Sequence, residues 1–181
     1  MKRLTPLVLA CLALFFGGVA TAQAHVLLIR PDGQPVGGIW QRWTNDAKIP
    51  TIDGRTILMD ASICQGALGC SEYYPADRTA ILHATNRQTL YFELGHLFDY
   101  EVLTWHDRGV LSLTWGTHGD PWNNSFSALQ QGREDGLTAD FAAAYQACAL
   151  GENFGGLASG DAPVIQTHDT CTLIRRFAKR S

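Results

Sequence analysis

Residues 85–100 constrain the fold more than any other stretch, because their apolar side chains recur at helical spacing on two opposite faces. A helix that is apolar on two faces packs between two layers of structure. We therefore expect this helix at the centre of the fold, with Glu93 and His96 as the chemical groups it carries inward. The first face comprises Leu90, Leu94, Leu97 and Phe98, and the opposite face comprises Phe92, His96, Asp99 and Leu103.

The beginning of this helix carries its own signal. Thr85 and Gln88 have the spacing of a capping box, in which a hydroxyl accepts a bond from the amide three residues on and the Gln side chain returns to the first amide. The sequence therefore predicts that the helix is capped by Thr85.

The segment Phe92-Glu93-Leu94-Gly95-His96 resembles the H-E-x-x-H helix of the zincin metallopeptidases. In that motif two histidines four residues apart bind one zinc ion, and the Glu acts as general base on the metal-bound water. Phe92 stands at the first ligand position here, while Glu93 and His96 stand at the positions of the base and the second ligand. The resemblance implies an α+β, zincin-like fold, with a small N-terminal β-sheet packed on the motif-bearing helix and a mainly helical C-terminal part.

A second segment, Ala139-Asp140-Phe141-Ala142, resembles the E-x-F-A helix that supplies the third zinc ligand in the gluzincin branch of that family. Ala139 falls on the ligand position, and Asp140 lies one residue later, about 100° round the helix. Catalytic zinc normally takes three protein ligands and a water. The candidate metal ligands are therefore His96, Asp99 and Asp140, with His106 and His118 as further candidates.

Four short segments before the central helix predict strands, so a small sheet precedes it. These segments are residues 25–30, 39–43, 55–59 and 79–84, and the segment between Cys64 and Cys70 is expected to be a loop. Residues 107–115 fit either a helix or a strand, and residues 116–124 fit a loop. Helices are predicted at 137–150 and 171–179, with a flexible link at 155–162 between them. Ala139, Ala142 and Ala143 give the first of these helices a small-residue face that permits close approach of another helix.

Residues 1–24 predict a secretory signal, because basic Lys2 and Arg3 precede an apolar run too short to span a membrane. Cleavage after Ala24 or Ala22 gives a mature start at His25 or Gln23. We expect one domain, residues 25–181, in the periplasm or outside the cell. The net charge of the whole chain is −3, and the mature chain has no basic run with interleaved aromatics, which argues against a nucleic-acid partner.

Four cysteines remain after the signal is removed, and an even number in an exported chain favours disulfides. Of the three possible pairings we favour Cys64 with Cys70 and Cys148 with Cys171. Neither pair has the C-x-x-C spacing of a zinc knuckle.

Three functions follow from these patterns. The first is a catalytically degenerate zincin-fold domain that needs no cofactor and acts by binding a peptide or protein ligand, or as a scaffold. The second is an atypical zinc metallohydrolase, in which His96 is joined by substitute ligands and Glu93 is the general base. The third is a copper protein that uses the amino group and imidazole of an N-terminal His25.

Overall fold

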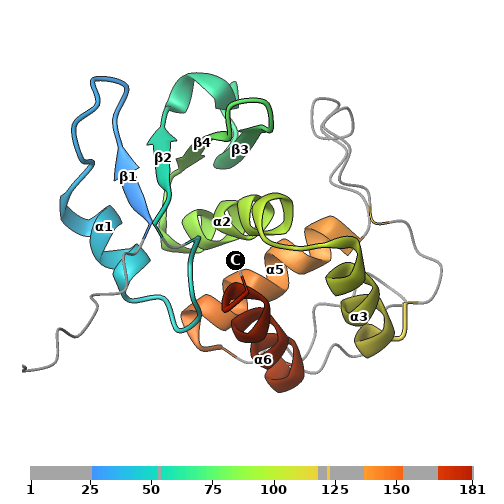
Figure 1. The fold of residues 1–181 in the computed structure, drawn as a ribbon. Coiled ribbons are helices and arrows are strands. Elements are labelled where there is room, and N and C mark those ends of the chain that lie inside the picture. Colours follow the sequence, from blue (N-terminus) through green and yellow to red (C-terminus); the bar gives the residue numbers. More distant parts are fainter. Residues whose placement is uncertain (1–25, 53, 118–121, 123–136, 153–166, 181) are drawn as a thin grey trace, which may run out of the picture.

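A four-stranded mixed sheet lies in the N-terminal half of the chain, with strand order β1-β2-β4-β3 (Figure 1). The computed structural model describes residues 26–52, 54–117, 122, 137–152 and 167–180. Strands β1, β2 and β4 are parallel, and β3 runs antiparallel to β4 at one edge. The strands are β1 Leu27–Ile29, β2 Thr56–Met59, β3 Gly69–Tyr74 and β4 Thr79–Ala84.

Helices make up most of the described chain after the sheet, which gives the mixed α+β architecture expected. The α-helices are α1 Gly38–Asn45, α2 Arg87–Glu101, α3 Trp105–Trp115, α5 Leu137–Leu150 and α6 Thr167–Ala178, and Ala61–Cys64 forms a 3-10 helix, η1. In the part of the chain that is described, no helix has both the length and the apolar character needed to cross a bilayer.

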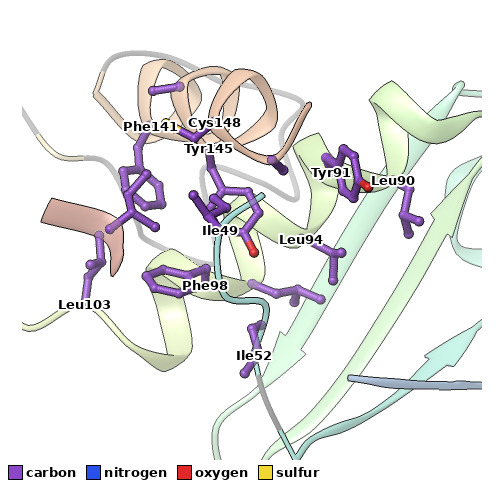
Figure 2. Packing of buried hydrophobic residues seen from close by; sticks show 14 of the residues in the cluster. Ile49, Ile52, Leu90, Tyr91, Leu94, Phe98, Leu103, Phe141, Tyr145 and Cys148 are labelled. Carbon is purple, nitrogen blue, oxygen red and sulfur yellow. The ribbon is translucent and has the colours of Figure 1, made fainter. Parts of the chain in front are cut away.

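Helix α2 is the layer between the sheet and α5 (Figure 1). Alternate residues of β4, such as Leu82, are buried on the side that α2 covers. On the other side, Phe98 of α2 lies with its ring centroid 5.3 Å from Tyr145 and 6.1 Å from Phe141, both on α5 (Figure 2). The prediction of a central helix packed between two layers is confirmed. Its predicted first face is divided between those layers, because Leu97 lies beside Ile57 and Ala80 of the sheet while Phe98 contacts α5.

Close approach of α2 and α5 depends on small residues. A Cβ placed on Gly95 would lie 2.9 Å from Ala142 Cα, closer than real Cβ atoms come, and 3.1 Å from the Ala142 carbonyl oxygen. The small-residue face predicted for residues 137–150 therefore does bring another helix close, and it does so through Ala142.

The predicted cap of α2 is wrong by one residue. Asn86 is the N-cap, and its side-chain oxygen accepts a hydrogen bond of 2.9 Å from the Thr89 amide. The Thr85 hydroxyl instead donates to the Leu68 carbonyl at 3.0 Å. The Thr85 hydroxyl is therefore bonded to the residue that precedes β3 and does not cap the helix. Asn86, which is among the most favoured N-cap residues, takes that role.

Four further expectations need correction or completion. The predicted strand at residues 39–43 is part of α1, where the Gln41 side chain bonds the backbone of β1. The expected loop between Cys64 and Cys70 leads directly into strand β3, which we did not predict. The undecided segment 107–115 is helical and belongs to α3, and the C-terminal helix begins at Thr167, before the predicted residue 171.

Both disulfides join the cysteines that the sequence favours. Cys64 of η1 is bonded to Cys70 of β3, and Cys148 of α5 is bonded to Cys171 of α6. Disulfides are typical of exported proteins. The predicted signal, the link at residues 155–162 and most of the expected loop at 116–124 lie outside the described residues.

Candidate functional site

The two positions that the zincin resemblance assigns to histidine ligands face each other on α2. Phe92 and His96 are one helical turn apart, and their rings meet edge to face with centroids 4.9 Å apart. His96 is 1% exposed, and neither of its ring nitrogens has a hydrogen-bond partner among the described residues. Burial lowers the pKa of His96 to about 4, so the imidazole is neutral near pH 7.

Glu93 is buried under the edge strand β3. The Ser71 hydroxyl donates a 2.8 Å hydrogen bond to Glu93 Oε2. Gly69 makes room for the same carboxylate, because a Cβ there would lie 2.8 Å from Glu93 Oε1 and 2.1 Å from Thr89 Cγ2. The carboxylate therefore joins α2 to β3, and the structure confirms that Glu93 and His96 are both carried inward.

Asp99 has partners other than His96. Arg108 Nε donates to Asp99 Oδ1 at 2.8 Å, and Arg108 Nη2 donates to the Asp99 carbonyl at 2.7 Å. Trp122 Nε1 lies 3.2 and 3.1 Å from the two carboxylate oxygens. Burial raises the pKa of Asp99, and the Arg108 charge with the Trp122 hydrogen bond opposes that rise.

The other candidate ligands are spread over the molecule. Asp140 is half-buried in the first turn of α5, and His106 is exposed on α3. His118 and His25 lie outside the described residues. Within the described ranges, no three side chains of His, Cys, Asp or Glu converge as a metal site would require. The described residues therefore supply too few donors around His96 to hold catalytic zinc.

Comparisons with protein family models, curated proteins and solved structures find no match.

The edge of β3 next to Glu93 carries main-chain groups that point away from the sheet. Thr85 and Leu68 form a hydrogen-bonded pair, because the Thr85 amide donates to the Leu68 carbonyl at 3.0 Å. In an antiparallel ladder such pairs recur at every second residue. The main-chain groups of residues 70, 72 and 74 therefore form hydrogen bonds with β4. The amides and carbonyls of Gly69, Ser71 and Tyr73 face outward, and in the described part of the chain no strand pairs with them.

The opposite edge of the sheet is protected. Gln41 of α1 donates from Nε2 to the Val26 carbonyl at 2.8 Å and accepts from the Leu28 amide at 3.3 Å. The Val36 amide donates to the Leu28 carbonyl at 2.9 Å. Natural sheets commonly cover their edges in this way, so the contrast singles out β3 as the edge able to pair with an added strand.

Arg108, Trp122 and Ser71 are site residues that sequence reasoning missed. Ser71 lies in a strand that the sequence did not predict. Arg108 lies in the segment left undecided between helix and strand, where a helical assignment would have placed an arginine near the end of the central helix. No local sequence signal pointed to Trp122.

Proposed function

We propose that this protein is an exported, catalytically degenerate zincin-fold domain that acts by binding a peptide or protein ligand. The observation that carries the proposal is the contact between Phe92 and His96, which places a benzene ring where the mechanism requires a second imidazole. The engagement of Asp99 by Arg108 and Trp122 supports it, because that carboxylate already has partners for both of its oxygens.

The ligand we propose is an extended peptide segment that adds a strand to β3. Main-chain pairing at an open sheet edge gives affinity for such segments. The outward amides and carbonyls of Ser71 and Tyr73 would supply this pairing, and Glu93 fixes the edge to α2 through Ser71. In this function Glu93 positions the binding edge.

Metal analysis with a gain-of-function variant tests the loss of catalysis. Protein purified from the exported fraction should hold far less than one zinc per chain and should not hydrolyse peptides. Phe92→His combined with Ala139→Glu should gain zinc, because residues 92 and 96 already face each other on one helix turn and position 139 is where the resemblance places the third ligand. Phe92→Leu combined with Ala139→Glu is the matched control and should gain none. Stoichiometric zinc in the unaltered protein, with hydrolysis that Glu93→Gln abolishes, would contradict the proposal.

Hydrogen exchange with peptides selected from a random library tests the binding edge. A selected peptide should slow amide exchange at Ser71 and Tyr73 and leave the β1 edge unchanged. Protection confined to other elements would show that β3 is not the binding edge.

An atypical zinc metallohydrolase is the second candidate, and the state of His96 favours it. A neutral imidazole whose two nitrogens have no partner among the described residues is the form that binds metal. This function requires ligands from residues outside the described ranges, such as His118. It predicts that His96→Leu loses both bound metal and activity, whereas the degenerate domain has neither to lose.

A further inference from the structure

Helix α6 presents one face to the protein and another to solvent. Thr170, Cys171, Ile174 and Phe177 are buried, on the side that contacts α5 and α3 (Figure 1). At about 100° per residue, the exposed residues of the last two turns fall on the opposite side. These are Thr172, Arg175, Arg176 and Lys179.

A fourth cation joins this face from a distant part of the chain. Arg175 Nη2 donates a 3.2 Å hydrogen bond to the Lys48 carbonyl, so the segment after α1 lies against α6. Lys48 is exposed. We call Lys48, Arg175, Arg176 and Lys179 the basic face.

The positive charge of the basic face is not neutralised within the described part of the chain. None of its four cations lies within ion-pair distance of a carboxylate there, whereas the nearby Arg180 is paired with Asp107. Glu152 follows Gly151, where an added Cβ would lie 3.3 Å from Lys48 Cγ, and it too forms no ion pair among those residues.

Helix dipoles favour each of these cations but do not explain why no carboxylate of the described chain pairs with them. Cations near the carboxyl end of a helix interact favourably with it, which accounts for Arg176 and Lys179 at the end of α6. Lys48 lies at the carboxyl end of α5, where its amide donates to the Ala149 carbonyl at 2.9 Å. Four cations without an ion pair in the described chain, gathered on one surface of a protein whose net charge is −3, indicate a partner that is negatively charged.

We propose that the basic face docks the protein on an anionic lipid surface. Arg175, Arg176 and Lys179 lie on the exposed side at the end of α6, and Lys48 lies beside them, so the four charges can meet a broad layer of negative charge together. Clusters of Lys and Arg on a helix bind anionic lipid in this way, and each cation near the surface changes the partition coefficient about fivefold. This inference is independent of the function proposed for the β3 edge.

Vesicle flotation tests the proposal with protein purified from the exported fraction. The unaltered protein should bind vesicles of phosphatidylcholine with roughly one third phosphatidylglycerol, and should not bind phosphatidylcholine alone. Because exposed charges are screened by salt, binding should fall steeply between about 50 mM and about 300 mM NaCl. The variant Arg176→Glu/Lys179→Glu should lower the partition coefficient about 25-fold or more.

The matched control is Arg30→Glu/Arg42→Glu, which makes the same change in net charge at exposed positions outside the basic face. It should bind nearly as the unaltered protein does. Equal binding to neutral and anionic vesicles, no binding at low salt, or equal losses in both double variants would overturn the proposal. Binding of poly-glutamate but not vesicles through the basic face would also overturn it, in favour of an acidic protein partner.

Discussion

At the scale of single residues, His96 is a titratable group held almost entirely away from water. Its pKa of about 4 in the folded protein lies below the ordinary value of 6.5, because burial disfavours the charged ring. The unfolded chain therefore binds a proton at a higher pH than the folded one does. Stability is retained above about pH 6.5 and is lost as the pH falls to about 4.

We predict that His96→Leu removes this pH dependence. A shift from 6.5 to about 4 corresponds to a loss of about 3 kcal/mol in the free energy of unfolding across that pH window. The variant should also be more stable near pH 7, by about 1–3 kcal/mol, because it no longer buries two ring nitrogens that lack partners in the described chain. Urea unfolding at about pH 7 and about pH 4.5 measures both effects.

The exposed His106→Leu serves as the control and should keep the pH dependence of the unaltered protein. If His96→Leu is less stable near pH 7, or loses as much stability on acidification as the unaltered protein, His96 has a partner outside the described residues.

The inward placement of Glu93 and His96 could be predicted from the sequence, because helical periodicity fixes which way a side chain points. The partners of Asp99 could not be predicted in this way. Spacing along α2 suggested His96, three residues away, but Arg108 and Trp122 reach Asp99 from other parts of the chain. Those contacts depend on where the chain turns after α2, and periodicity carries no information about that turn.

At the scale of elements, two glycines in helices give opposite predictions for the same substitution. Gly95→Ala should destabilise the protein by about 1–3 kcal/mol, because the new Cβ would lie 2.9 Å from Ala142 Cα and would push α2 away from α5. Gly109→Ala should stabilise it by about 0.5–1 kcal/mol, because no atom of the described residues lies within 4 Å of a Cβ at that position on α3. Thermal and urea unfolding of both variants test this. Equal effects would mean that helix propensity, and not packing, governs position 95.

Elements were predicted best where a long periodic pattern had clear ends. Leu137–Leu150 was predicted to the residue, since its apolar and small faces both follow helical spacing. The prediction of a strand at residues 39–43 is wrong, because a segment of five residues is too short to distinguish helical from strand spacing. There, tertiary contacts from Gln41 to β1 favour the helix. Strand β3 was missed because Gly69, Cys70, Ser71 and Glu72 lack the apolar alternation of a strand.

At the scale of the whole molecule, two disulfides close loops of different length. Cys148 and Cys171 are separated by 23 residues and join α5 to α6, whereas Cys64 and Cys70 are separated by 6. A cross-link restricts the unfolded chain more when its loop is longer. Loop entropy gives about 3 kcal/mol for the first bond and about 2 kcal/mol for the second.

We therefore predict that Cys148→Ala/Cys171→Ala lowers the free energy of unfolding by more than Cys64→Ala/Cys70→Ala does. Helix α6 should remain docked in the first variant, because Trp115 Nε1 still donates to Thr170 Oγ1 at 3.0 Å and Ile174 and Phe177 stay buried. Urea unfolding compares the free energies, and amide hydrogen exchange across α6 reports docking. A larger loss from the Cys64 and Cys70 pair would show that the clip between η1 and β3 acts through native packing, since loop length alone gives the opposite order.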